Sequence, residues 1–222
     1  EHKIELFKPE EYWTLTSSFT NIENKNIFSK LSLFNAEKVE RFTFKSKDEI
    51  NKAIEVINKS KFKVKDVNSK VFRRNPLGPF TTSTLQQTAS GRFGFGASRT
   101  MQIAQRLYQG IEIEGETTGL ITYMRTDGTN ISKEAITDFR RLIEKDFGKN
   151  FIPENPNNFA GKKAKNAQEA HEAIRPTNIT RKPDDIKKYV NSDQYKLYDL
   201  IWSRALSSQM CPAEFDRNTI LI

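Results

Sequence analysis

The sequence has few of the residues that build disulfides and metal clusters. Its 222 residues include one cysteine, Cys211, and two histidines, His2 and His171. A lone cysteine excludes an internal disulfide and a zinc cluster made of cysteines, and it fits a reducing compartment. A His-Glu-x-x-His zinc motif is absent too, because Arg175 stands where its second histidine would be. We therefore expect no metal ligands in this chain.

Long apolar runs are also missing. No stretch approaches the roughly 20 apolar residues of a membrane span, and residues 1–5 lack the pattern of a signal peptide. We expect no membrane partner and a cytoplasmic location. The chain has no initiator Met and stops inside an apolar run at residues 219–222. Both features lead us to expect a piece of a longer polypeptide.

Acidic residues are outnumbered by basic ones. The chain has 36 Lys and Arg against 28 Asp and Glu, a formal net charge of +8 and a pI near 9.4. Such an excess predicts an acidic partner, most commonly nucleic acid, because cations that neutralise phosphates release counterions. Solvated basic faces are the alternative. Residues 67–111 contain no acid, and their basic residues are Lys70, Arg73, Arg74, Arg92, Arg99 and Arg106.

The pattern of apolar residues divides the chain in two. Alternation and β-branched or aromatic residues predict strands at 3–7, 12–19, 28–34 and 41–45 and an extended segment at 62–65. A helix is expected to follow Ser46, over residues 48–58. Residues 75–79, Asn-Pro-Leu-Gly-Pro, break the pattern. We predict an α+β fold with a β-rich segment at 1–74, re-entered at 211–222, and a helical domain at 75–210.

Within the helical domain, helices are expected at 82–90 and 98–109, joined by a glycine-rich turn at 91–96. This arrangement occurs in helix-turn-helix DNA-binding modules, but it more often belongs to two helices that simply pack together. The helices expected further along begin at Ser132, at Pro183 and at the N-cap Ser192, and Gly148 ends the first of them. A polar loop is expected at residues 153–165.

The segment 119–127 carries the candidate chemistry. In an extended segment, Tyr123 and Arg125 project to the same face because side chains alternate. A free phenol ionises only to the order of 0.1% at neutral pH, so phosphodiester attack by a tyrosine needs a proton acceptor or cations on the phosphate. An arginine two residues away supplies such a cation. The alternative is a core or edge-strand tyrosine beside a solvated arginine.

Several separated blocks of sequence favour a catalytic Tyr123 over a structural one. They lie at residues 79–87 (Pro-Phe-Thr-Thr-Ser-Thr-Leu-Gln-Gln), 93–94 (Phe-Gly), 104–108 (Ala-Gln-Arg-Leu-Tyr), 121–127 (Ile-Thr-Tyr-Met-Arg-Thr-Asp) and 168–176 (Gln-Glu-Ala-His-Glu-Ala-Ile-Arg-Pro). In this order they resemble the bacterial type IA DNA topoisomerases. The resemblance continues more faintly to both ends, so it covers essentially the whole chain.

The resemblance implies the arch and tyrosine domains of that family. It makes Tyr123 the nucleophile, which would attack a backbone phosphate of a single strand, form a 5′-phosphotyrosine and release a 3′-hydroxyl. Strand passage and the reverse reaction would relax negatively supercoiled DNA without ATP. Arg125 would contact the phosphate, and His171 would bind DNA phosphate nearby. Further candidate DNA contacts are Arg92, Arg99, Arg106, Thr126 and Asp127.

Two departures from the family pattern matter. Gly128 stands where the family usually has Ser. The family also binds Mg²⁺ through Asp-x-Asp carboxylates of an N-terminal acidic domain with a catalytic Lys, and this chain has no Asp-x-Asp; Asp184 and Asp185 lie among lysines. We expect the Mg²⁺ ligands in the rest of the same polypeptide, and an inactive chain without it. We further expect a monomer associated with the nucleoid.

Two rival functions use the same residue types. Tyrosine recombinases and type IB topoisomerases place a His-x-x-Arg motif before a C-terminal tyrosine, whereas Tyr123 precedes His171, and Arg175 lies four residues beyond that histidine. Order and spacing both disagree. The remaining alternative is a non-enzymatic, helix-turn-helix-like DNA-binding module that uses the acid-free stretch.

Overall fold

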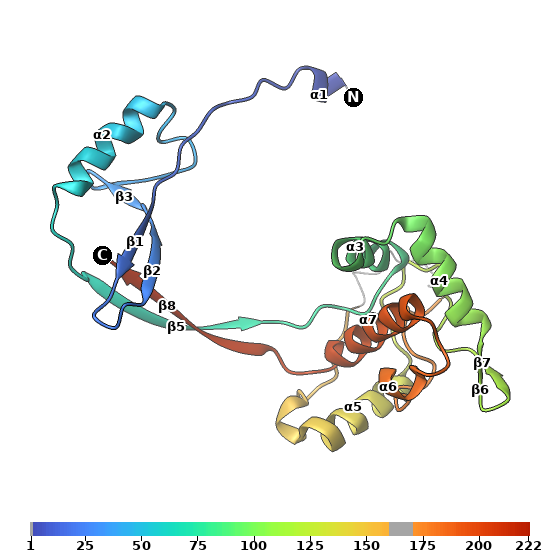
Figure 1. The fold of residues 1–222 in the computed structure, drawn as a ribbon. Helices are drawn as coiled ribbons and strands as arrows, with labels where there is room; N and C mark the ends of the chain where they lie inside the picture. The colour runs from blue at the N-terminus through green and yellow to red at the C-terminus, as the bar shows by residue number, and fades with distance from the viewer. Residues whose placement is uncertain (1, 160–170) are drawn as a thin grey trace, which may run out of the picture. The chain divides into compact units, whose positions relative to one another are not determined.

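The computed structural model describes residues 2–159 and 171–222, which form two compact units (Figure 1). One unit comprises Glu1–Asn68 with Thr219–Ile222, and the other comprises Ser69–Asn218. Strands β5 (Asp66–Arg74) and β8 (Ala213–Leu221) pair as a two-stranded ribbon, and the division falls inside both strands. The sequence placed this division at the Pro/Gly break after residue 74 and before residue 211, outside the ribbon.

The first unit is built from small hairpins and one amphipathic helix. Its core is Phe44, Ile50 and Ala53, with six half-buried apolar side chains around them that include Trp13. Its elements are α1 (His2–Glu5), β1 (Thr16–Thr20), β2 (Asn26–Lys30), β3 (Leu33–Phe34), β4 (Glu37–Lys38) and α2 (Lys47–Asn58). Strands β1 and β2 are antiparallel in the register Thr16↔Lys30 to Thr20↔Asn26.

Several expected strands of this unit are shorter or absent. Residues 3–7 were expected as a strand, but the chain forms α1 there. Residues 41–45 form no strand; only Phe44 pairs, in an isolated bridge in which its carbonyl accepts from the Trp13 N–H at 2.9 Å. Phe44 is 5% exposed, so its place in the core accounts for the alternation that predicted a strand. Residues 62–65 are irregular, and β5 begins after them.

The second unit is mainly helical. Its elements are α3 (Thr82–Phe93), α4 (Ala97–Gln109), the hairpin of β6 (Ile111–Ile113) and β7 (Glu116–Thr118), α5 (Lys133–Phe147), a 3-10 turn (Lys149–Phe151), α6 (Pro183–Ile186) and α7 (Ser192–Ser208). One core joins α3, α4 and α7 around Phe80, Leu85, Leu107 and Tyr198. A second core joins α5 to the end of α7 around Phe139 and Ile143.

Three local details of this unit differ from expectation. Helix α3 continues through Gly91 and ends only at Gly94, whose φ of 68° is the left-handed conformation that glycine adopts without strain. The N-cap of α7 is Asn191, which forms a capping box with Gln194, so Ser192 is the first helical residue. The β6–β7 hairpin was not predicted. None of the helices that the structure describes is long and apolar enough to cross a membrane.

Candidate functional site

The segment from Ile121 to Gly128 holds Tyr123 at the surface of the helical unit. Only Ile121 forms a bridge, to Pro176, so no regular strand extends to the tyrosine. Exposure nevertheless alternates from residue 123 to 128: Tyr123, Arg125 and Asp127 are exposed, and the residues between them are buried. This alternation agrees with the expectation that Tyr123 and Arg125 share a face.

The Tyr123 ring lies between two other aromatic rings. Tyr108 of α4 meets it edge-on with 5.4 Å between ring centroids, and His171 lies at 5.2 Å with an interplanar angle of 52°. Tyr123 is 36% exposed. No hydrogen bond joins its hydroxyl to another residue of the described part of the chain. The ring is therefore held by packing, while the hydroxyl carries no structural bond there that a reaction would have to break.

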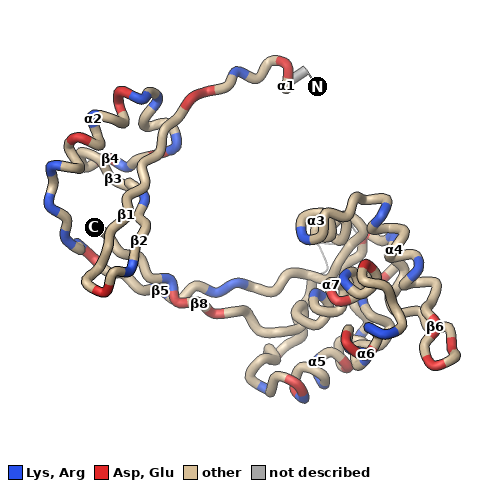
Figure 2. Tube along the Cα trace, viewed as in Figure 1, with Lys and Arg blue, Asp and Glu red and all other residues tan. Residues whose placement is uncertain are grey.

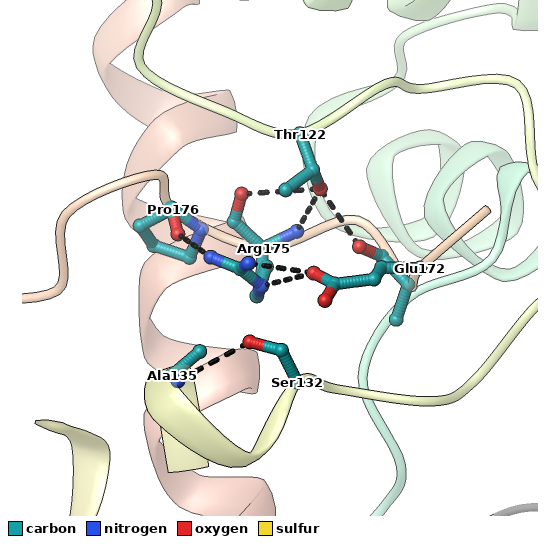
Figure 3. A network of polar contacts seen from close by, with 7 residues as sticks. Thr122, Ser132, Ala135, Glu172, Arg175 and Pro176 are labelled. Carbon is teal, nitrogen blue, oxygen red and sulfur yellow. Dashed lines mark hydrogen bonds and ion pairs between the residues drawn. The ribbon is translucent and has the colours of Figure 1, made fainter. Parts of the chain in front are cut away.

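Two threonine hydroxyls fix the backbone on either side of Tyr123. Thr82, in the first turn of α3, donates to the Met124 carbonyl at 2.8 Å and accepts from the Thr126 N–H at 2.8 Å. Thr122 donates to the Ala173 carbonyl at 2.7 Å and accepts from the Arg175 N–H at 3.0 Å (Figure 3). The side-chain hydroxyls of these two threonines thus take the place of the backbone hydrogen bonds of a regular β-ladder, which this segment lacks.

The segment 171–176 lies beside the tyrosine segment and is also hydrogen-bonded to the backbone of other parts of the helical unit. The Ile174 N–H donates to the Phe80 carbonyl at 2.8 Å, and the Ala173 N–H donates to the Asn130 carbonyl at 2.9 Å. The Arg175 guanidinium pairs with Glu172 at 2.6 Å and 2.7 Å and is 14% exposed (Figure 3). Arg175 is thereby neutralised and held within the fold, while His171 at the start of the segment is exposed.

We predict that Thr122→Val destabilises the chain by about 1–3 kcal/mol. Valine keeps the shape of threonine but leaves the Arg175 N–H and the Ala173 carbonyl without their partner. Thermal unfolding of the 222-residue chain measures the loss, which should appear as a melting point several degrees lower. Thr122→Ser keeps the hydroxyl and is the matched control. Equal melting points for the valine and serine variants would show that the hydroxyl does not hold this segment.

The other candidate residues fall into separate groups. Arg99, Arg106 and Arg125 line one groove along α4. Arg99 is also paired with Asp193 at 2.5 Å and lies 4.7 Å over the Phe95 ring. Arg92 does not line this groove. It lies near Arg204, whose guanidinium pKa is lowered by burial and, to a smaller extent, by the charge of Arg92.

Gly128, which stands where the family usually has serine, lies in close contact with the backbone of His171. A Cβ built on Gly128 would lie 2.5 Å from the His171 carbonyl oxygen and 3.2 Å from the Thr126 hydroxyl. Glycine therefore allows the backbone of His171 to approach the tyrosine segment closely. Thr126 is 8% exposed and its hydroxyl accepts from the Gly128 N–H at 2.9 Å. That contact braces the segment, and a DNA contact by Thr126 or Asp127 stays a prediction.

The described residues offer no evident place for Mg²⁺. Within residues 2–159 and 171–222, no three His, Cys, Asp or Glu side chains gather as a metal site. Asp184 accepts from the Tyr195 hydroxyl at 3.0 Å, and Asp185 accepts from the Lys182 N–H at 2.9 Å in a helix cap. These two carboxylates are engaged in the fold, and neither belongs to a group that could hold the ion.

Comparison with known proteins identifies the family. The sequence profile described as DNA topoisomerase matches residues 1–222. The chain is 47% identical over 210 residues to DNA topoisomerase 1 of Rickettsia typhi, covering 95% of this chain and 27% of the relative. It is 43% identical over 222 residues to DNA topoisomerase 1 of Haemophilus influenzae, covering 100% of this chain and 24% of the relative.

The fold agrees with this match. The structure of full-length topoisomerase I from Thermotoga maritima superimposes with a TM-score of 0.75 at 34% identity, over 99% of this chain and 32% of that one. The chain therefore belongs to the bacterial type IA DNA topoisomerase family, and the predicted α+β fold is confirmed. It spans about a quarter of the length of the relatives named above.

Sequence reasoning missed the residues that hold the site together. The hydroxyls of Thr82 and Thr122 lie inside the blocks that carry the resemblance, but a threonine bonded to a distant backbone leaves no periodic signal. Tyr108 also lies in such a block, and its contact with Tyr123 depends on how α4 packs. A glycine at 128 in place of the usual serine was a visible signal, and its meaning needed the position of His171.

Proposed function

We propose that this chain is the tyrosine-bearing, DNA-cleaving part of a type IA DNA topoisomerase. The Tyr123 oxygen attacks a backbone phosphorus of a single strand, and its proton leaves to an acceptor. The bond to the 3′-oxygen breaks, so a 5′-phosphotyrosine forms and the 3′-oxygen leaves as a hydroxyl after taking up a proton. The observation that carries the proposal is the exposed Tyr123 ring held between Tyr108 and His171, with Arg125 exposed two residues away.

The roles of the neighbouring residues follow from charge and position. Arg125 contacts the attacked phosphate, since a guanidinium fits phosphate oxygens and stabilises charge that develops there. His171, exposed and beside Tyr123, binds a phosphate close to the cleaved one. Arg99, Arg106 and Arg92 bind DNA further away. The reaction exchanges one phosphodiester for another, so rejoining the cleaved strand needs no ATP.

The complete activity requires more than this chain. Because no three candidate metal ligands gather within residues 2–159 and 171–222, we propose that the ion and its acidic ligands belong to another part of the same polypeptide. The chain alone is then inactive in relaxation. The substrate is single-stranded and negatively supercoiled DNA, the enzyme acts as a monomer, and its place is the nucleoid in the cytoplasm.

The polarity of the adduct tests this function. The complete enzyme is mixed with Mg²⁺ and a single-stranded oligonucleotide labelled at either its 3′ or its 5′ end, and the products are separated on denaturing gels. We expect the 3′-end label to stay with the protein. Retention of the 5′-end label would mean the opposite polarity and a different class of enzyme. Binding without any adduct would favour the non-enzymatic helix-turn-helix-like module.

A further inference from the structure

A groove of about 700 Å³ opens along α4 next to the tyrosine segment. Met124 and Arg125 form one part of its wall, and the first turn of α7 forms another. Its polar lining consists mainly of three arginines and five amides, with a single carboxylate, Asp193. These arginines and amides are Arg99, Arg106, Arg125, Gln102, Gln105, Gln109, Asn191 and Gln194.

The outward face of α4 has a composition unlike that of an ordinary solvated helix. Helix α4 contains no acidic residue, and the charged positions coloured on it in Figure 2 are basic. Arg99, Gln102, Arg106 and Gln109 recur at spacings of three and four, which place them on one face. Thr100, Ile103, Ala104 and Leu107 are buried on the other side. The N-cap Gly96 supplies no side-chain hydrogen bond, so the N–H groups of the first turn lack a side-chain cap where the groove meets Ser98 and Arg99.

This lining suits a nucleotide. Guanidinium groups and an uncapped helix N-terminus attract phosphate. An amide presents a donor and an acceptor together, which is what a base edge requires. Asp193 neutralises Arg99, while neither Arg106 nor Arg125 has a carboxylate partner within the described part of the chain. The volume lies in the range of sites that enclose small ligands, roughly 300–1,000 Å³.

The groove begins next to the nucleophile. Gln105 lines it and lies one helical turn before Tyr108, whose ring contacts Tyr123. Arg125, proposed above to bind the attacked phosphate, belongs to its wall. After cleavage the phosphate on Tyr123 carries the nucleotide on the 3′ side of the broken bond. That nucleotide is tethered beside the groove through Tyr123, whereas the nucleotide on the other side has no covalent link to the protein.

We propose that this groove holds the first nucleotides on the 3′ side of the cleaved bond and that the amides of Gln102 and Gln105 select among their bases. Among residues 2–159 and 171–222, neither amide has another hydrogen-bond partner. The proposal rests on the proposed function and adds to it a source of cleavage-site preference. Amides that read a base edge well discriminate between bases by roughly 5- to 150-fold.

Photocrosslinking locates the nucleotide without relying on catalytic rate. An oligonucleotide with one 4-thiothymidine at the first, second or third position after the cleavage site is bound to the complete enzyme and irradiated. Trypsin cuts after Arg99 and Arg106 and releases residues 100–106, which carry both amides. We expect the crosslink on this peptide for the first or second position. Crosslinks confined to other peptides at all three positions would overturn the proposal.

Base selection is tested with substituted strands. Cleavage by the wild-type enzyme is compared among strands that differ only in the base at those positions, and the comparison is repeated with Gln105→Ala, Gln102→Ala and Gln87→Ala. Gln87, an exposed amide of α3 outside the groove, is the matched control. We expect at least about a fivefold preference in wild type and Gln87→Ala, and a nearly equal rate for all bases when either groove amide is removed.

Base selection in the groove and nucleophilic attack by Tyr123 are disproved by different results. A wild-type enzyme that cleaves well but shows no base preference at these positions disproves base selection in the groove and leaves Tyr123 as the nucleophile. A preference that survives in both Gln102→Ala and Gln105→Ala has the same meaning. A wild-type enzyme that forms no adduct on any strand disproves the proposed function. A uniform loss of activity in the variants, with the preference unchanged, assigns the amides to folding and also overturns the proposal.

Discussion

Replacing Tyr123 by phenylalanine in the complete enzyme should abolish the covalent DNA adduct and leave folding and most of the DNA affinity unchanged. The substitution removes one oxygen, the proposed nucleophile, and keeps the ring that packs against Tyr108 and His171. Within the described part of the chain the hydroxyl makes no hydrogen bond, so its loss leaves no buried partner unsatisfied there. Contacts to phosphates by basic residues supply most of the affinity and are not touched.

The measurement is the yield of adduct with an end-labelled single strand, together with strand affinity by fluorescence anisotropy. Tyr108→Phe is the matched control, because Tyr108 is similarly exposed, at 40% against 36%, and lies against the same ring. We expect the control to form adduct. An adduct that persists in Tyr123→Phe would place the nucleophile elsewhere, and loss of adduct in both variants would bring the Tyr108 hydroxyl into the reaction.

Local signals in the sequence predicted much of the helical framework. Ser46 caps α2 by accepting from the Glu49 N–H, and Ser132 caps α5, which ends at Gly148. These predictions succeeded because a cap depends on residues within one helical turn. The end of α3, predicted at residue 90 but found at Phe93, shows the limit of prediction from local signals. Gly91 was as plausible a stop as Gly94, but in the structure Gly91 is helical and Gly94 takes the left-handed conformation that ends the helix.

The geometry of the site depends on contacts between distant parts of the chain. Thr122 bonds to residues 51 and 53 positions later, and Thr82 bonds to residues 42 and 44 positions later. No periodicity encodes such pairs, so Tyr123 and Arg125 could be proposed from their spacing and the family resemblance, but their support could not. The same reasoning applies to the α4 groove, which appears only when the tyrosine segment, α4 and α7 come together.

Removing the charge beside the nucleophile should be almost as damaging as removing the nucleophile. We expect Arg125→Ala in the complete enzyme to slow single-turnover cleavage by about 10²–10³-fold, the cost of losing one preorganised group that stabilises developing charge. Arg125 is exposed and has no ion-pair or hydrogen-bond partner in the described part of the chain, so the loss should come from the transition state and the fold should remain intact. An unchanged melting temperature would verify this.

The conservative variant and a distant control separate charge from geometry. Arg125→Lys keeps the charge but loses the planar fork that engages two phosphate oxygens, so its rate should fall between those of wild type and alanine. Arg141→Ala removes another exposed arginine, from α5, where it pairs with Asp138 at 3.5 Å, and should cleave at the wild-type rate. If Arg125→Ala also cleaves at that rate, Arg125 plays no part in the reaction, and charge stabilisation must come from another part of the enzyme. If lysine restores the full rate, charge alone suffices, and the two-residue spacing from Tyr123 matters only because it brings a cation within reach of the phosphate.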